Sequence, residues 1–280
     1  MIQDIFPHQL NNQYDAHAKP EQDDYVLCFR QSDVLTKKTL KNGSEMIELP
    51  KISDFGEGGT YTYLFSVDEE RYFLLEQEQA VNAEKYEYIN VRELENRGLQ
   101  QRYRVYAAMT GKHLADWYRD TKFCGRCGHP MVHSGTERAM VCQDCGNTVY
   151  PRIMPAVIVG VKNGDQLLLT RYRRGFAQNA LIAGFTEIGE TVEETVAREV
   201  MEEAGLHVKN LTYYKSQPWG VANDILMGFY CDVDGDTEIH MDAQELKYAQ
   251  WVNREDIQLQ KNDFSLTNEM MQMFKEGRIH

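Results

Sequence analysis

The sequence contains no long apolar segment and no recognisable secretion signal. None of its apolar runs approaches the roughly 20 residues that a transmembrane helix requires, so no membrane association is expected. The initial segment, MIQDIFPHQLNNQYD, has no basic region followed by an apolar core. We therefore expect a cytoplasmic protein.

Basic residues are outnumbered by acidic ones. Lysine and arginine total 30 against 43 aspartate and glutamate, which gives a net charge of −13. A general nucleic-acid-binding protein is disfavoured, because neutralising phosphates requires a basic surface. A local basic pocket for a small anion remains open, and Arg171, Arg173 and Arg174 are a candidate cluster, or else a solvated strand end. The 42% hydrophobic content is that of a globular protein, and the length of 280 residues predicts about two domains.

Disulfide bonds are not expected, because four of the six cysteines fall into two C-x-x-C pairs. The pairs are Cys124 with Cys127 and Cys142 with Cys145, and a glycine follows each pair. Four thiolates at this spacing favour a tetrahedral Zn²⁺ site with a closed coordination shell, which is structural rather than catalytic. A redox dithiol is the less favoured alternative. We predict a zinc ribbon over residues 123–150.

The remaining patterns predict an α+β multidomain protein. Residues 1–92 are rich in tyrosine, and the alternation in 61–67 and 71–76 predicts strands of an antiparallel sheet in a β-rich domain. Residues 93–122 show helical spacing and predict a linker helix or helix pair, with a break at Gly111.

Residues 151–280 alternate strands and helices. A hairpin is predicted over 154–172, because two apolar runs flank Asn163-Gly164, a dipeptide suited to a tight turn. Helices are predicted near 191–204 and 265–276.

The helix near 191–204 carries an unusual group of carboxylates. Thr191 and Glu194 have the spacing of a capping box, and Gly205 is a natural terminator. At about 100° per residue, Glu199, Glu202 and Glu203 fall within an arc of roughly 100°. Like charges at this spacing are unfavourable unless a cation joins them, and hard divalent cations such as Mg²⁺ or Mn²⁺ take carboxylate ligands. The alternative is a solvated acidic face.

The surrounding residues resemble the Nudix box. Gly184 is followed after five residues by Glu190 and after seven more by REVMEEAGL, residues 198–206, so that all defined positions of the box match. The resemblance implies an α/β/α sandwich that hydrolyses a nucleoside diphosphate linked to another moiety. Glu199 and Glu203 would then be metal ligands, and Glu202 a further ligand or an activator of the attacking water.

In the same box, Arg198 would orient a carboxylate through a bidentate pair, and Glu190 would be part of the catalytic group. Metal ions would neutralise the diphosphate and lower the pKa of a bound water. Spacing does not distinguish Mg²⁺ from Mn²⁺ or say which glutamate acts as the base.

The order of the predicted domains indicates which group of Nudix proteins the sequence resembles. A β-rich domain, a zinc ribbon and a Nudix domain with the segment SQPW at 216–219 are similar to the bacterial NADH pyrophosphatases. The resemblance is weakest over residues 1–92, which the family would make a Nudix-like β-rich domain. It implies cleavage of NAD(H) to nicotinamide mononucleotide and AMP by a homodimer. It also implies a further metal ligand at Glu245 and substrate contacts from four residues: Tyr150, Phe185, Gln217 and Trp219.

One segment departs from that family. After Trp219 the family has Pro-Phe-Pro, whereas residues 220–224 are GVAND, a more flexible sequence without the aromatic side chain. ADP-ribose or another nucleoside diphosphate derivative therefore stays open as the substrate. Removal of a 5′-NAD cap from RNA, with assistance from the ribbon, is also open. A non-catalytic ligand sensor or nucleic-acid-binding protein is less favoured, because it would not need all three glutamates.

Overall fold

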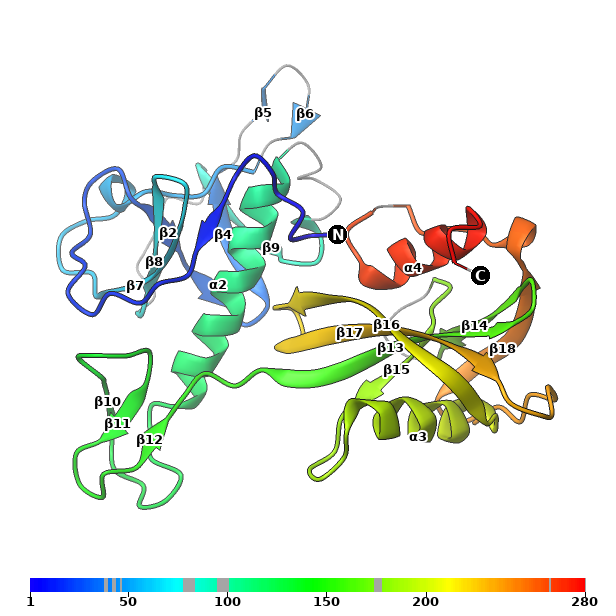
Figure 1. The fold of residues 1–280 in the computed structure, drawn as a ribbon. Helices are drawn as coiled ribbons and strands as arrows, with labels where there is room; N and C mark the ends of the chain where they lie inside the picture. The colour runs from blue at the N-terminus through cyan, green and yellow to red at the C-terminus, as the bar shows by residue number, and fades with distance from the viewer. Residues whose placement is uncertain are drawn as a thin grey trace. The chain divides into compact units, whose positions relative to one another are not determined.

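The computed structural model describes residues 1–37, 40–41, 44–45, 47–77, 84–94, 101–173, 178–261 and 263–279. The chain divides into two compact units (Figure 1). One contains Met1, Ile153–Pro218 and Asp224–His280, and the other contains Ile2–Arg152 and Trp219–Asn223. Within the described residues, no helix is both long and apolar enough to span a membrane.

The N-terminal part of the second unit is built from short strands. A four-stranded sheet has the order β1 (Leu10–Asn11), β7 (Tyr61–Val67), β8 (Glu70–Leu75), β2 (Tyr25–Leu27). A three-stranded sheet has the order β3 (Phe29–Arg30), β4 (Asp33–Lys37), β9 (Tyr86–Asn90), and β5 (Leu40–Lys41) pairs with β6 (Ser44–Glu45). The two alternating stretches do form strands, and β7 pairs antiparallel with β8. The β2–β8 pair is parallel, so the sheet is mixed rather than antiparallel throughout.

Helix α2 (Arg102–Asp120) runs without interruption through Gly111. The predicted break at Gly111 is therefore wrong. A Cβ at this position would lie 2.1 Å from Cδ1 of Leu27 and 3.6 Å from Cδ1 of Leu64. The glycine thus allows the helix to pack closely on the sheet, and this packing outweighs the intrinsic helix penalty of glycine.

The cysteine-rich segment forms a small antiparallel sheet of β10 (Met131–His133), β11 (Met140–Cys142) and β12 (Thr148–Val149). Two contacts attach it to the N-terminal part of the same unit, one to strand β7 and one to the segment after β1. Arg138 Nη2 donates to the carbonyl of Leu64 at 2.6 Å, and the Tyr14 hydroxyl donates to the carbonyl of Ser134 at 2.8 Å. The ribbon is therefore a packed part of this unit.

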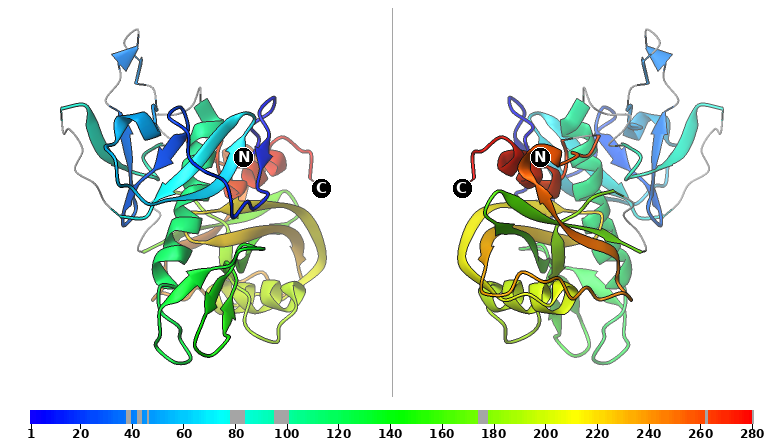
Figure 2. Two further views of the ribbon diagram at one scale, coloured as in Figure 1. Left: turned by 90° about the vertical axis from the view of Figure 1, so that its left-hand side faces the viewer. Right: turned by 90° about the vertical axis from the view of Figure 1, so that its right-hand side faces the viewer.

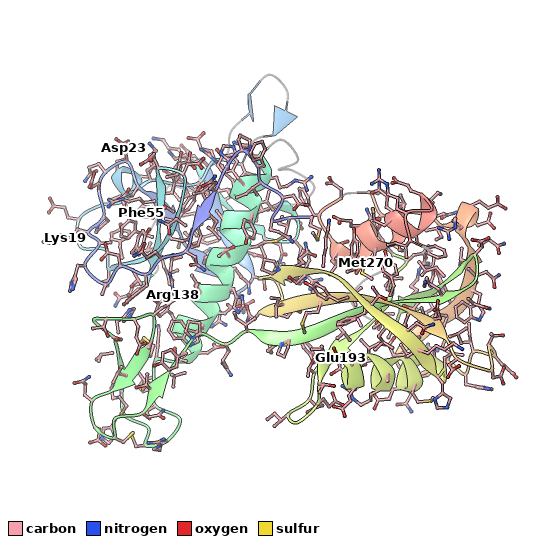
Figure 3. The ribbon with its side chains drawn as sticks, in the orientation of Figure 1. Lys19, Asp23, Phe55, Arg138, Glu193 and Met270 are labelled. Carbon is pink, nitrogen blue, oxygen red and sulfur yellow. The ribbon has the colours of Figure 1, made fainter. Side chains whose placement is uncertain are left out.

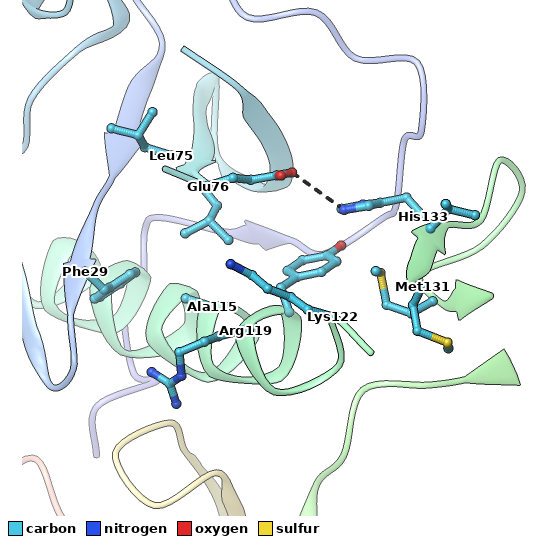
Figure 4. Close-up of a pocket in the computed structure, with 12 residues that line it drawn as sticks. Phe29, Leu75, Glu76, Ala115, Arg119, Lys122, Met131 and His133 are labelled. Atoms are coloured by element: carbon cyan, nitrogen blue, oxygen red, sulfur yellow. Dashed lines mark ion pairs between the residues drawn. The ribbon is translucent and has the colours of Figure 1, made fainter. Parts of the chain in front are cut away.

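A cavity of about 500 Å³ lies between the N-terminal strands β3 and β8, helix α2 and the ribbon (Figure 4). Its apolar wall includes Leu74, Met131 and Met140. His133 Nε2 lies 3.6 Å from the carboxylate of Glu76, and the His133 ring stacks on Tyr118 with 4.9 Å between ring centroids. The volume is in the range of small-molecule sites.

The other unit contains one six-stranded mixed sheet. Its order is β16 (Val208–Trp219), β17 (Asp224–Val233), β13 (Met154–Asn163), β14 (Gln166–Tyr172), β18 (Leu246–Asn253), and β15 (Ile182–Phe185) also pairs with β13. Strand β13 runs parallel to β17 and antiparallel to both β14 and β15. The sheet has two faces for helices to cover.

Helices α3 (Val192–Ala204) and α4 (Leu266–Lys275) cover these opposite faces (Figures 1 and 2). Successive residues of a strand point to opposite sides. Accordingly, Val157 and Val159 of β13 pack in the cluster that contains Val196 of α3, whereas Ile158 packs in the cluster that contains Met270 of α4. Figure 3 shows Glu193 of α3 and Met270 on the two sides of the sheet. The α/β/α sandwich expected for residues 151–280 is present.

The predicted β13–β14 hairpin is also present, but its turn lies one residue later. Asn163 is the last residue of β13 and pairs with Gln166, so that Gly164 and Asp165 form the loop. Gly164 has a φ of +59°, which glycine adopts without a steric penalty. A two-residue loop that begins with a positive-φ glycine matches the twist of the paired strands.

Candidate active site

Helix α3 carries the clustered carboxylates, and local signals fix both its ends. Thr191 Oγ1 accepts a hydrogen bond from the backbone N–H of Glu194 at 3.2 Å, and the Glu194 carboxylate accepts one from the N–H of Thr191 at 2.8 Å. Gly205 ends the helix with a φ of +68°. The predicted capping box and terminator are therefore confirmed.

Two of the three carboxylates on α3 are buried. Glu199 is 9% exposed and Glu203 is 2% exposed, whereas Glu202 lies on the solvent side. Gly184 of β15 explains how Glu199 fits, because a Cβ on Gly184 would lie within 1.9 to 2.2 Å of the Glu199 carboxylate. Only glycine lets the strand lie against that carboxylate.

Arg198 donates hydrogen bonds to four other groups of the box, which are three carboxylates and one backbone carbonyl. Its Nε and Nη2 donate to the two carboxylate oxygens of Glu190 at 2.6 and 3.0 Å, which is a bidentate pair. Its Nη1 donates to Glu199 at 2.7 Å and to Glu202 at 3.0 Å, and its Nη2 also donates to the carbonyl of Phe185 at 2.9 Å. These hydrogen bonds from Arg198 lower the pKa of Glu190 to about 2. The arginine thus fixes the loop before α3 onto the helix.

Glu203 has a different environment from the other carboxylates. Its two oxygens accept hydrogen bonds from the hydroxyl of Tyr172 at 3.0 and 3.1 Å, and none of the described residues forms an ion pair with it. Burial raises the pKa of Glu203 to about 8, with a smaller contribution from the charges of Glu199 and Glu245. Burial likewise raises the pKa of Glu199. A buried carboxylate with no cationic partner fits a metal ion as its counter-charge.

A loop after β17 brings Glu245 towards the same site. The N–H of His240 donates to the carbonyl of Ala204 at 2.9 Å, and the N–H of Asp242 donates to the carbonyl of Glu203 at 3.0 Å. The carbonyl of Glu245 accepts from the N–H of Arg173 at 2.9 Å. The loop therefore satisfies carbonyls at the end of α3, and the side chain of Glu245 is exposed.

The predicted basic cluster is only partly available for phosphates. Arg173 Nε donates to the carbonyls of Ala243 and Leu246 at 2.6 and 3.1 Å, so it holds the loop that carries Glu245. Arg171 lies over the ring of Tyr248 at 5.3 Å. Arg174 lies outside the described residues.

The four proposed substrate contacts have unlike surroundings. Phe185 is 49% exposed at the end of β15, and Tyr150 is 54% exposed with its hydroxyl donating to Glu137. Trp219 is half-buried. Gln217 is fully buried: its amide donates to the carbonyl of Phe264 and accepts from the N–H of Leu266, both at 2.7 Å. This geometry gives Gln217 a structural role at the start of α4 rather than a substrate contact.

The raised pKa of Glu203 predicts a stability that depends on pH. A carboxyl with a folded pKa of about 8 and an ordinary value of 4.5 favours folding while it is protonated. The full stabilisation is present when the pH is below the ordinary pKa of 4.5, and it is lost as the pH rises through the folded-state pKa of about 8. Since a tenfold change in proton affinity is worth about 1.4 kcal/mol, the loss amounts to a few kcal/mol.

The measurement is the unfolding free energy from pH 5 to 9 without added divalent cations. The wild-type protein should lose stability relative to Glu203→Gln as the pH rises across this range. Parallel curves for the two proteins would contradict the assignment, because the variant lacks only this titrating group.

The four cysteines form the second site. The Sγ atoms of Cys127 and Cys142 are 3.5 Å apart, those of Cys127 and Cys145 are 3.4 Å apart, and those of Cys124 and Cys145 are 3.6 Å apart. Thiolates about 2.3 Å from a tetrahedral zinc ion lie about 3.8 Å from one another, so the cluster fits Zn²⁺ closely. The N–H of Arg126 also donates to Cys124 Sγ at 3.4 Å. Gly128 and Gly146, with φ of +80° and +70°, allow the turns after each pair.

The fold and the two sites together define a zinc-ribbon protein with a Nudix-type sandwich. Residues 152–274 match the model of the NUDIX domain, and residues 119–150 match the model of the NADH pyrophosphatase zinc ribbon domain. The chain therefore combines a Nudix domain with an NADH pyrophosphatase zinc ribbon.

The chain is similar to bacterial proteins named NAD-capped RNA hydrolase NudC, two of which serve as examples. Those of Citrobacter koseri and Klebsiella pneumoniae subsp. pneumoniae are each 47% identical over 152 residues. Each match covers 53% of this chain and 58% of the relative, so the chain spans little more than half the length of these relatives. A solved structure of a NUDIX hydrolase from Nitrosomonas europaea matches with a TM-score of 0.48 and 20% identity, covering 56% of this chain and 92% of that chain.

Proposed function

We propose that the protein is a metal-dependent pyrophosphatase that hydrolyses NAD(H) to nicotinamide mononucleotide and AMP. The observation that carries the proposal is the set of carboxylates on α3, where Glu199 and Glu203 are buried and Glu203 has a raised pKa but no ion-pair partner among the described residues. The Nudix domain gives the reaction class, and the type of zinc ribbon supports a pyridine dinucleotide as the substrate.

In this proposal the residues of the box have distinct tasks. Glu199, Glu203 and Glu245 hold Mg²⁺ or Mn²⁺, and Glu202, which lies on the exposed side of α3, is a further ligand or accepts a proton from the attacking water. When bound, the metal neutralises diphosphate oxygens and makes a water molecule more acidic. Arg198, through its bonds to Glu190, Glu199 and Glu202, fixes the positions of these carboxylates.

Aromatic side chains would bind the substrate. Phe185 is exposed at the end of the strand that contains Gly184, and a flat aromatic face gains contact with a base at a small entropic cost. Tyr150 and Trp219 are proposed as further contacts. A homodimer and a cytoplasmic location are also proposed, on the resemblance to the bacterial NADH pyrophosphatases.

The second candidate substrate is RNA with a 5′-NAD cap. The names of the relatives favour it, and the bond that would be cleaved is the same pyrophosphate. ADP-ribose is a third candidate, because residues 220–224 depart from the sequence that marks NADH specificity.

The test is product identification with NADH, NAD⁺, ADP-ribose and a short NAD-capped RNA, each incubated with the purified protein and Mg²⁺ or Mn²⁺. Release of AMP and reduced nicotinamide mononucleotide from NADH is the expected result. A preference for capped RNA, with a 5′-monophosphate RNA as the product, would favour the second candidate. Absence of any cleavage would contradict the proposal and favour a ligand sensor.

A further inference from the structure

Tyr172, the last residue of strand β14, connects the sheet to helix α3 through its hydroxyl group. That hydroxyl donates to the Glu203 carboxylate, with its oxygen 3.0 and 3.1 Å from the two carboxylate oxygens. It also accepts a hydrogen bond from the backbone N–H of Ala183 at 3.1 Å. Ala183 precedes Gly184, the first residue of the box, so the phenol bridges both ends of that motif.

The position of Tyr172 depends on an irregularity of the sheet. Strand β14 pairs regularly with β18 up to Arg171, and the register shifts between Arg171 and Tyr172. A bulge of this kind changes the direction of the side chain that follows it. Here it accompanies a tyrosine whose hydroxyl reaches α3.

The carboxylates on α3 are thus held in two different ways. Glu199 and Glu202 receive hydrogen bonds from the guanidinium of Arg198, whereas Glu203 receives one from a phenol. A guanidinium brings a positive charge that offsets the charge of the carboxylate, whereas a phenol, with an ordinary pKa of about 10, is uncharged and supplies no counter-charge. An ionised carboxylate has about four lone-pair sites, so the Tyr172 hydroxyl and the nearby backbone N–H of Ala183 leave sites free for a cation.

We propose that Tyr172 is a positioning residue that orients the Glu203 carboxylate for a divalent cation without adding a positive charge that would compete with that cation. The inference rests on the proposed metal site and names a residue outside the Nudix box. Groups that form hydrogen bonds to a metal ligand, without coordinating the metal themselves, contribute about 10- to 100-fold to metal affinity in other metalloproteins.

The experiment measures Mn²⁺ binding by electron paramagnetic resonance without substrate, on the full chain with its zinc retained. Tyr172→Phe keeps the ring and removes the hydroxyl, and we expect its Mn²⁺ affinity to fall about tenfold or more. The matched control is Tyr214→Phe. Tyr214 also donates to a carboxylate of the same unit, that of Glu269 at 2.8 Å, and its loss should leave Mn²⁺ affinity unchanged.

A purely structural role for Tyr172 predicts a different pattern. It would lower the melting temperature but leave Mn²⁺ affinity at the wild-type value in the folded protein, and that result would overturn the proposal. In turnover assays Tyr172→Phe should lower kcat at a fixed Mn²⁺ concentration without raising KM for the dinucleotide.

A double variant tests whether Tyr172 acts through Glu203. Adding Tyr172→Phe to Glu203→Gln should change the remaining Mn²⁺ affinity less than twofold, and a further tenfold loss would contradict the proposal. Binding of Mn²⁺ without hydrolysis of NADH would overturn the proposed function but not this inference. Failure of the wild-type protein to bind Mn²⁺ in a manner sensitive to Glu203→Gln would overturn the inference.

Discussion

Glu203→Gln should reduce turnover by about a thousandfold while the protein remains folded. Glutamine has the same shape as glutamate and can still accept a hydrogen bond from Tyr172, but it removes the negative charge that the metal ion requires. The loss of several kcal/mol of metal-dependent stabilisation in the transition state corresponds to about three orders of magnitude in rate.

Glu193→Gln is the matched control for this experiment. Glu193 lies on the same helix but is exposed, so removing its charge should leave turnover near the wild-type value. Initial rates with saturating Mg²⁺ or Mn²⁺, together with circular dichroism and zinc content, are the required measurements. Full activity in Glu203→Gln would contradict the assignment of the carboxylates on α3 as the metal site.

The same substitution should not destabilise the protein when Mg²⁺ and Mn²⁺ are absent. Burial raises the pKa of Glu203 to about 8, which means that folding disfavours its charged form. A neutral amide avoids this cost, so the melting temperature at alkaline pH should equal or exceed that of the wild-type protein. The carboxylate thus has an energetic cost for folding that is offset only when a cation binds.

Local signals in the sequence predicted the elements that carry the site. Thr191, Glu194 and Gly205 act within one turn of the ends of α3, so the helix could be located without knowledge of the rest of the fold. The spacing of the cysteine pairs likewise depends on short turns, and the four thiol groups do come together. The roles of the individual glutamates in catalysis remain predictions.

Features that depend on distant contacts could not be predicted. Tyr172 reaches Glu203 across 31 positions of sequence through a bulge at the end of β14, and no local pattern signals that contact. Gly111 was expected to break a helix, whereas its close approach to Leu27 decides its role. Gln217 belongs to the segment SQPW, for which the family resemblance predicts substrate contacts, but both ends of its amide form hydrogen bonds at the start of α4.

Cys142→Ser should abolish zinc binding and unfold the ribbon. The Cys142 side chain is 1% exposed and its Sγ lies 3.5 Å from that of Cys127, so a serine leaves an incomplete tetrahedral site. Structural zinc sites contribute on the order of 10 kcal/mol to the folding of the segment that binds them. The short strands β10, β11 and β12 have too small a core to replace that contribution.

The measurements are zinc content by atomic absorption and limited proteolysis with mapping of the cleavage sites. Cleavage of Cys142→Ser should concentrate within residues 123–150, because the strands of this segment depend on the metal. Cys28→Ala is the control: Cys28 is a buried cysteine of the same unit outside the zinc cluster, and the variant should retain its zinc. A zinc content of Cys142→Ser equal to that of the wild-type protein would contradict the four-cysteine assignment.

Mn²⁺ binding by Cys142→Ser separates the two metal sites. Four thiolates close the coordination shell of zinc and leave no position for a substrate oxygen, so we expect the ribbon site to have no direct part in the proposed hydrolysis. Glu199, Glu203 and Tyr172 all belong to the other compact unit, which has its own sheet and core. Mn²⁺ affinity should therefore survive the loss of zinc, and a matching loss of both metals would show that the carboxylate site requires a folded ribbon.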